Sequence, residues 1–180
     1  MKIYVVPRMY IEKMINSNPN WVGGKWIISI YSSEKGIDFS PLPDRFNILK
    51  LQFDDISERD KEDIINDNYI FFNENHAKQI HEFIKDIKEN DTREFYVHCD
   101  AGVSRSGAVG YLLNEYFNKY LTLNRIDNES FKMNNNHILP NPLVVRILKN
   151  ELFGRPFAGV EVNDYTYNED GEREDHIERI

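Results

Sequence analysis

The sequence contains a single cysteine, Cys99, among its 180 residues. One thiol cannot form an intramolecular disulfide, and it cannot supply a cysteine-rich zinc site. The five histidines are scattered along the chain, and His76 and His81 lie five residues apart, which is off the helical spacing of a metal-binding pair. We therefore expect no disulfide framework, no metal and no cofactor. Any chemistry at Cys99 is predicted to be that of a free thiol.

Long hydrophobic runs and an excess of positive charge are also missing. Apolar runs such as Tyr4 to Val6 and Trp26 to Ile30 are far shorter than the roughly 20 residues that a transmembrane helix needs. Pro7 and Arg8 end the first run before it could form a signal-peptide core, so a cytoplasmic location is expected. Lys and Arg number 22 against 30 Asp and Glu, for a net charge of −8. This balance argues against nucleic acid and anionic membranes as partners, because both attract cationic surfaces.

The remaining composition is typical of one globular domain, with 41% hydrophobic and 29% charged residues. Charge is concentrated at the end of the chain. Residues 161–180 hold eight acids and two arginines, a net of −6, which leaves −2 for residues 1–160. Since the few apolar residues of the last segment could not offset the entropy of ordering it, we predict a domain over 1–160 and a mobile acidic tail over 161–180.

Short runs rich in β-branched and aromatic residues alternate with segments of helical periodicity. The runs predict four strands, over Ile3–Val6, Trp26–Tyr31, Ile48–Phe53 and Phe95–His98. The periodic segments predict three helices, over Asn75–Asn90 with Asn73 as its cap, from Ser106 to about Tyr120, and over Leu143–Phe153. This alternation favours an α/β fold in which helices flank a central, largely parallel sheet.

The most informative segment is residues 95–107, Phe-Tyr-Val-His-Cys-Asp-Ala-Gly-Val-Ser-Arg-Ser-Gly. It combines a strand, a tight loop and the start of a helix, and in α/β sheets ligands bind at this kind of junction. Backbone amides that precede a helix N-terminus bind anions, and the helix dipole adds partial positive charge. We predict that a phosphate-like dianion is held by Asp100, Ala101, Gly102, Val103, Ser104 and Arg105.

Cys99 stands at the start of this loop. The loop amides and the Arg105 guanidinium would stabilise its thiolate, which is a nucleophile at neutral pH. The planar fork of Arg105 could hold two phosphoryl oxygens. Ser106 could donate a hydrogen bond to the sulfur and make it a better leaving group. His98 is expected to hold the loop by hydrogen bonds and not to take the proton.

The sequence His98-Cys99, five residues, then Arg105-Ser106 resembles the signature of the cysteine-dependent protein tyrosine phosphatases. The fuller form, His-Cys-x-Ala-Gly-x-Ser-Arg-Ser, is similar to the dual-specificity branch. The resemblance implies a phosphatase-like fold and a metal-free reaction through a phosphocysteine, with Cys99 as nucleophile and Arg105 as phosphate ligand. It also implies a phosphorylated protein as substrate. The sequence contains no loop of the kind that clamps phosphotyrosine in tyrosine-specific enzymes. We therefore expect phosphoserine and phosphothreonine to be substrates as well as phosphotyrosine.

The resemblance also implies an aspartic acid, on a loop after an upstream strand, that protonates the leaving oxygen. Two candidates follow Phe53. Strand alternation groups Asp55 with Phe53 and places Asp54 on the other face, so Asp55 is favoured over Asp54. Asp55 lies 44 positions before Cys99, a longer separation than in compact dual-specificity enzymes. The extra length, from Ser57 to Phe72, is interpreted as an insertion with a short helix beginning at Ser57, and it leaves Asp60 as a third candidate.

Other functions remain as alternatives. An RNA 5′-phosphatase of the same fold is the enzymatic alternative, weakened by the negative charge. A pseudophosphatase that binds phosphorylated partners without hydrolysing them is the non-enzymatic one. Lipid phosphatases tend to have basic residues inside the loop, whereas this loop has Asp100. Rhodanese-like sulfurtransferases use a cysteine loop without an aspartic acid, so Asp55→Ala would separate them from phosphatases.

Overall fold

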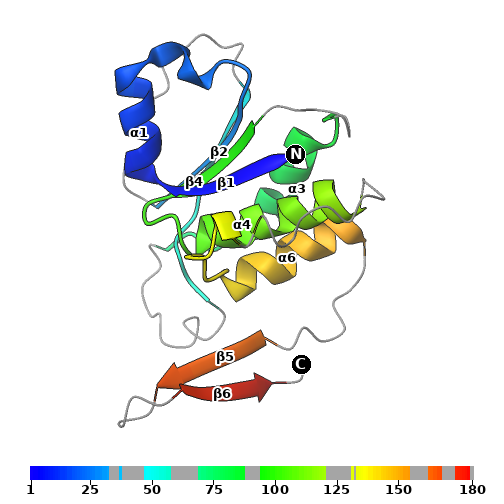
Figure 1. Ribbon diagram of the computed structural model, residues 1–180. Coiled ribbons are helices and arrows are strands. Elements are labelled where there is room, and N and C mark those ends of the chain that lie inside the picture. The colour runs from blue at the N-terminus through cyan, green and yellow to red at the C-terminus, as the bar shows by residue number, and fades with distance from the viewer. Residues whose placement is uncertain are drawn as a thin grey trace.

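The computed structural model describes residues 1–32, 37, 47–57, 69–87, 94–120, 131, 133–154, 162–167 and 173–178. Its centre is a four-stranded sheet of β1 (Lys2–Pro7), β2 (Trp26–Tyr31), β3 (Asn47–Gln52) and β4 (Glu94–Cys99) (Figure 1). The strand order is β1-β4-β2-β3, and every neighbouring pair is parallel. All four predicted strands are present within one residue at each end. The largely parallel sheet confirms the predicted fold class.

Three helices cover one face of the sheet: α3 (Glu74–Ile84), α4 (Arg105–Asn114) and α6 (Pro142–Phe153) (Figure 1). Beyond Asn114, α4 continues as the π-helix η2 (Glu115–Tyr120). Asn73 caps α3 as predicted, since its Oδ1 accepts hydrogen bonds from the backbone N–H of Asn75 and His76. Residues 88–90, the end of the predicted helix, lie outside the described residues. No helix in the described part of the chain combines the length and apolar character needed to cross a membrane.

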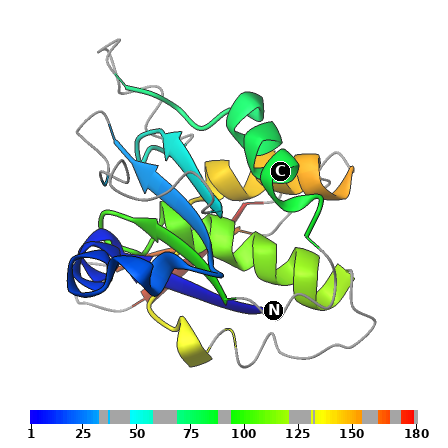
Figure 2. The ribbon, with the colours of Figure 1, turned by 90° about the horizontal axis from the view of Figure 1, so that it is seen from above.

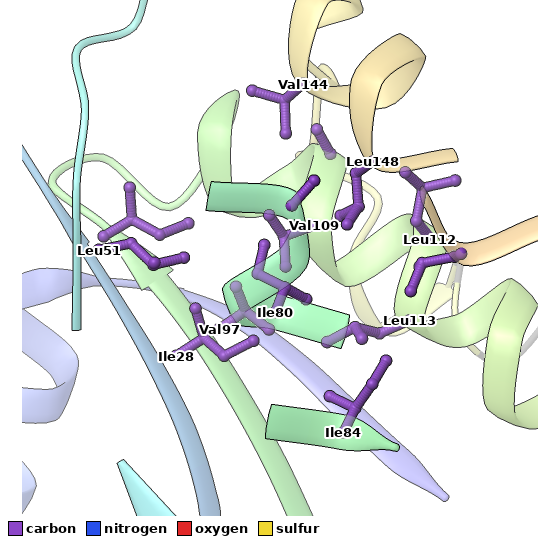
Figure 3. Close-up of a cluster of buried hydrophobic side chains, with 14 of the residues drawn as sticks. Ile28, Leu51, Ile80, Ile84, Val97, Val109, Leu112, Leu113, Val144 and Leu148 are labelled. Carbon is purple, nitrogen blue, oxygen red and sulfur yellow. The ribbon is translucent and has the colours of Figure 1, made fainter. Parts of the chain in front are cut away.

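The main hydrophobic core lies between this face and the three helices (Figure 3). Side chains alternate along each strand, so Ile28 and Ile30 of β2 point into it, while Ile27 points to the opposite face. Helix α4 packs directly on β1 and β4, and its residues from Arg105 to Gly110 are all buried. Gly110 permits close packing, because a Cβ there would lie 2.4 Å from Cγ2 of Val5.

The second face of the sheet is covered by α1 (Arg8–Ser17) and the 3₁₀ helix η1 (Pro19–Val22), which leaves the sheet between two layers (Figures 1 and 2). A smaller core cluster forms here around Ile11, Val22, Ile27 and Tyr96. Sequence analysis did not predict α1. The helix follows β1 directly and no side chain caps its first turn, so the sequence contains no capping signal for its start, although Ile11, Met14 and Ile15 have helical spacing.

The backbone of the edge strand β1 forms hydrogen bonds with the side chain of Asn135, which is 2% exposed. The backbone N–H of Val5 donates to Asn135 Oδ1 at 2.8 Å. Asn135 Nδ2 donates to the carbonyls of Ile3 at 3.4 Å and Phe131 at 2.9 Å. The amide of Asn135 thus pairs with the outer edge of β1 as a neighbouring strand would.

Beyond the domain, β5 (Val162–Tyr167) and β6 (Arg173–Glu178) pair as an antiparallel two-stranded sheet. The sequence analysis predicts no strands in residues 161–180, and the mobility of this acidic segment stays a prediction. The short helix predicted from Ser57 and the candidate Asp60 fall in residues 58–68, outside the described residues.

Candidate active site

The loop of residues 100–104 joins β4, which ends at Cys99, to α4, which begins at Arg105. It therefore lies at the carboxyl end of a central strand of a parallel sheet, as predicted. The fold brings Cys99, Arg105 and Ser106 together with Asp55, which follows β3. Ligands in open α/β sheets bind at this edge.

Cys99 is 1% exposed and immediately precedes the loop. Its Sγ is 3.1 Å from Oγ of Ser106, within hydrogen-bonding distance for sulfur. Ser106 is fully buried in the first turn of α4, so its hydroxyl is held against the sulfur by packing. A hydroxyl in this position can donate to a thiolate.

Arg105 is 5% exposed, and its guanidinium is fixed by three hydrogen bonds. Nη1 donates to Ser32 Oγ and to the carbonyl of Phe53, both at 2.9 Å. Nη2 donates to Asp100 Oδ2 at 2.6 Å, and this ion pair joins the buried guanidinium to an exposed carboxylate. Nε has no hydrogen-bond partner among the described residues. The group is thus anchored at the ends of β2 and β3 and keeps donors available to an anion over the loop.

Three of the five carbonyl groups of residues 100–104 accept hydrogen bonds from neighbouring segments. Asp100 O accepts from Arg8 N at 3.2 Å, Val103 O from Leu139 N at 3.2 Å, and Ser104 O from Asn141 N at 3.3 Å. The N–H groups of residues 101–104 donate to no described residue. This orientation leaves several amides for a bound anion, which is the geometry of a phosphate-binding nest.

Gly102 allows this loop conformation. Its φ is +75°, in the left-handed region that side chains rarely adopt, and a Cβ there would lie 2.5 Å from Pro7 N and from Val6 C. The loop therefore packs directly on the backbone at the end of β1. No other residue could occupy this position without displacing one of the two segments.

Asp55 contacts the loop. Its Oδ1 accepts hydrogen bonds from Ser104 Oγ at 2.7 Å and from Asn141 Nδ2 at 2.8 Å, and the residue is exposed. Ser104 occupies the N-cap position of α4, but its side chain forms no cap and bonds to Asp55 instead. An exposed carboxyl group beside the loop could exchange a proton with a ligand there.

Asp54 has a different environment. It is 9% exposed, its Oδ2 accepts from Ile70 N at 2.8 Å, and its own N–H donates to Ile70 O at 2.7 Å. Its carboxylate is therefore used to join the end of β3 to the segment before α3. The two neighbouring aspartates thus have different partners, but β3 ends at Gln52, so the strand alternation used to separate them does not extend this far.

Asn141 is a site residue that the sequence analysis missed. It is 4% exposed and caps α6, since Oδ1 accepts from Val144 N at 3.2 Å. Its Nδ2 donates to both Asp55 Oδ1 and the carbonyl of Ile56, the latter at 3.3 Å. Asparagine before proline is a helix-start signal that the sequence does contain. No pattern in the sequence indicates that Asn141 contacts Asp55, because the two residues are 86 positions apart.

His98 is 1% exposed, and neither ring nitrogen has a hydrogen-bond partner among the described residues. Burial lowers the pKa of His98 to about 4, and the charge of Arg8 acts in the same direction. The backbone of Cys99 and the carboxylate of Asp100 oppose this shift without compensating for it. The imidazole is therefore neutral at physiological pH.

Within the described residues, no three His, Cys, Asp or Glu side chains come together in a way that could hold a metal ion.

Comparison with known proteins identifies the fold. No family model and no curated protein matches the sequence. Among solved structures, the chain is similar to the human tyrosine phosphatase-like serine/threonine/tyrosine-interacting protein, with 21% identity and a TM-score of 0.51. That match covers 82% of this chain and 89% of the other. The Cydia Pomonella PTP-2 phosphatase is 18% identical, with a TM-score of 0.48, over 99% of this chain and 95% of that one.

The first of these similarities shows that the chain has a tyrosine-phosphatase-like fold over most of its length. It confirms the phosphatase-like fold that the resemblance around Cys99 implies. At 21% identity the similarity establishes the fold, and the activity has to be argued from the site.

Proposed function

We propose that this protein is a cysteine-dependent phosphatase that hydrolyses phosphotyrosine, phosphoserine and phosphothreonine in proteins. The observation that carries the proposal is the geometry of residues 99–105. Three loop carbonyls bond to neighbouring segments, the N–H groups of residues 101–104 donate to no described residue, and Arg105 adds a buried cation. A site built in this way can bind a phosphate dianion and present a nucleophile beneath it.

In the first step, the Cys99 thiolate attacks phosphorus, and the bond from phosphorus to the side-chain oxygen of the substrate breaks. The loop amides and Arg105 stabilise the charge on the equatorial oxygens. Phosphate competes with Asp100 for Nη2 of Arg105, since a carboxylate oxygen holds that donor at 2.6 Å. Asp55 donates its proton to the leaving oxygen, which departs as a hydroxyl group.

In the second step, Asp55 as the carboxylate takes a proton from water, and the oxygen of that water attacks phosphorus. The sulfur–phosphorus bond breaks, and inorganic phosphate and the thiolate are released. The hydroxyl of Ser106, 3.1 Å from the sulfur, stabilises the departing thiolate by a hydrogen bond.

Hydrolysis of para-nitrophenyl phosphate in the presence of EDTA tests this proposal. The wild-type protein should release phosphate, and Cys99→Ser should reduce the rate to background. Asp55→Asn should lower kcat by about a hundredfold, as expected for the loss of a general acid and base. Asp54→Asn is the matched control, because its amide oxygen can still accept from Ile70 N, and it should lose far less.

No phosphate release by folded wild-type protein with Cys99 reduced would overturn the proposal. Competition by vanadate or inorganic phosphate for a labelled phosphopeptide would then identify a phosphate-binding module without turnover. Equal losses in Asp54→Asn and Asp55→Asn would contradict the role given to Asp55.

A further inference from the structure

Asp100 places a negative charge at the start of a loop that is otherwise suited to an anion. Its Oδ2 lies 2.6 Å from Nη2 of Arg105, which is the distance of a strong charge-assisted hydrogen bond. The side chain of Asp100 is 47% exposed, whereas that of Arg105 is 6% exposed. A carboxylate in this position repels a phosphate group unless it moves away or is paired with another cation.

The donors of Arg105 leave little choice to an anion. Nη1 donates to Ser32 Oγ and to the carbonyl of Phe53, which accounts for both of its hydrogens. An anion that binds two parallel N–H groups of the guanidinium therefore has to use Nε and Nη2. Nε has no hydrogen-bond partner among the described residues, and Nη2 is bound to Asp100. A phosphate group and the carboxylate of Asp100 thus compete for the same donor.

The ion pair has a physical reason. A buried guanidinium that lacks a counter-charge is costly, because the protein interior solvates the charge poorly. Asp100 supplies this counter-charge to Arg105 from within the loop whenever no anion is bound. The same pairing opposes phosphate binding, since the contact between Asp100 and Nη2 has to be given up first.

Arg8 lies near the second oxygen of the same carboxylate. Its Nη1 is 3.8 Å from Asp100 Oδ1, and its backbone N–H donates to the carbonyl of Asp100 at 3.2 Å. Nε of Arg8 donates to Glu12 Oε1 at 2.8 Å, and neither Nη1 nor Nη2 forms a hydrogen bond with a described residue. The guanidinium of Arg8 is thus held beside Asp100 and keeps donors that a carboxylate can use.

We propose that Asp100 exchanges partners when a phosphate group binds, leaving Nη2 of Arg105 and pairing with Arg8. The exchange needs only a rotation of a half-exposed side chain, because the hydrogen bond between the two backbones already fixes Asp100 next to Arg8. Arg8 then pairs with a carboxylate that would otherwise repel the phosphate. Asp100 and Arg8 thereby set the affinity of the site for phosphate. This inference rests on the phosphate site of the proposed function and does not require hydrolysis.

Calorimetric titration of inorganic phosphate into Cys99→Ser protein tests the exchange without turnover. Asp100→Asn, added to this background, nearly preserves the size of the side chain and removes its charge. It should lower the Kd for phosphate about tenfold, on the scale of a hydrogen bond between charged groups. Phosphate should also raise the Tm of the Asp100→Asn protein by more than it raises the Tm of the parent.

Arg8→Met distinguishes the exchange from simple charge repulsion. With Asp100 present, loss of Arg8 leaves the displaced carboxylate without a partner, and the Kd for phosphate should rise about fivefold. In the Asp100→Asn background there is no carboxylate to receive, so the same substitution should change the Kd by less than about twofold. Lys13→Met is the matched control, because it removes one positive charge from an exposed residue of the same helix. It should change the Kd by less than about twofold in both backgrounds.

The same rise in Kd after Arg8→Met in both backgrounds would overturn the exchange, because Arg8 would then act on the phosphate itself. An unchanged or higher Kd in Asp100→Asn would also overturn it, since the carboxylate would then not compete for Arg105. Equal effects of Lys13→Met and Arg8→Met would reduce the role of Arg8 to net charge and refute the inference. Failure of the proposed function is a separate result, in which phosphate binding follows the expected pattern but the wild-type protein does not hydrolyse para-nitrophenyl phosphate.

Discussion

Asn141 Nδ2 lies 2.8 Å from Oδ1 of Asp55, so the residue that caps α6 also holds the proposed general acid against the loop. The side chain performs the two tasks through different atoms, with Oδ1 accepting from the helix and Nδ2 donating to Asp55 and Ile56. Helix α6 is thereby linked to the end of β3 through one buried amide. The position of Asp55 depends on this link and on Ser104.

Asn141→Ser separates the two tasks of this residue. Serine can still cap α6, but it is too short to reach Asp55, so we expect a small change in Tm and a loss of activity. The loss should be about tenfold greater for phosphoserine peptides than for para-nitrophenyl phosphate, since a poor leaving group depends more on protonation. Steady-state kcat on both substrates measures it. Equal losses on the two would contradict a positioning role toward Asp55.

Gly102→Ala should disrupt the loop. The new Cβ would lie 2.5 Å from Pro7 N at a φ of +75°, so either β1 or the loop must move. We expect phosphatase activity to fall to near background and the free energy of unfolding to fall by about 2–4 kcal/mol. Gly24→Ala is the control: its φ is +71°, but nothing lies within 4 Å of the added Cβ. It should cost about 1 kcal/mol and keep activity.

Asn135→Ala should destabilise the domain without a direct effect on the site. The substitution leaves the N–H of Val5 without its acceptor in a buried environment, and each buried group that loses its partner costs about 1–3 kcal/mol. Urea unfolding followed by tryptophan fluorescence should give a loss of about 2–4 kcal/mol with an unchanged m value. Asn136→Ala replaces an exposed neighbour and should change stability by less than about 0.5 kcal/mol. A similar loss in both variants would contradict the role of the buried amide.

His98 should make the protein less stable in mild acid. Burial lowers its pKa from 6.5 to about 4, so between these values the unfolded chain binds more protons than the folded one. Stability should therefore fall as the pH is lowered through this window, by up to about 3 kcal/mol from this residue. Urea midpoints from pH 7 to pH 4 for the wild type and His98→Gln measure the effect.

The His98→Gln curve should be flatter than that of the wild type over the same window, because the imidazole that must bind a proton on unfolding is gone. His137→Gln removes a solvent-exposed imidazole and serves as the control, with a curve parallel to that of the wild type. Parallel curves for His98→Gln and the wild type would refute the assignment of this pH dependence to His98.

The sequence was sufficient for the fold class, the four strands, the Asn73 cap and the position of the loop between β4 and α4. These features depend on local properties: side-chain periodicity, capping residues and the order of residue types over a dozen positions. Strand alternation was the reason to prefer Asp55 over Asp54, but β3 ends at Gln52, before both residues. Helix α1 was missed because it follows β1 directly and has no capping side chain to mark its start.

The contacts that complete the site were decided by tertiary structure alone. Asn141 meets Asp55 across 86 residues, Arg105 meets Ser32 across 73, and the segment after Pro7 braces the loop at Asp100. Each contact depends on the order in which the parallel strands assemble, because that order brings distant strand ends to one edge of the sheet. Local sequence patterns determine which groups can do chemistry here, and the strand order determines which of them stand together.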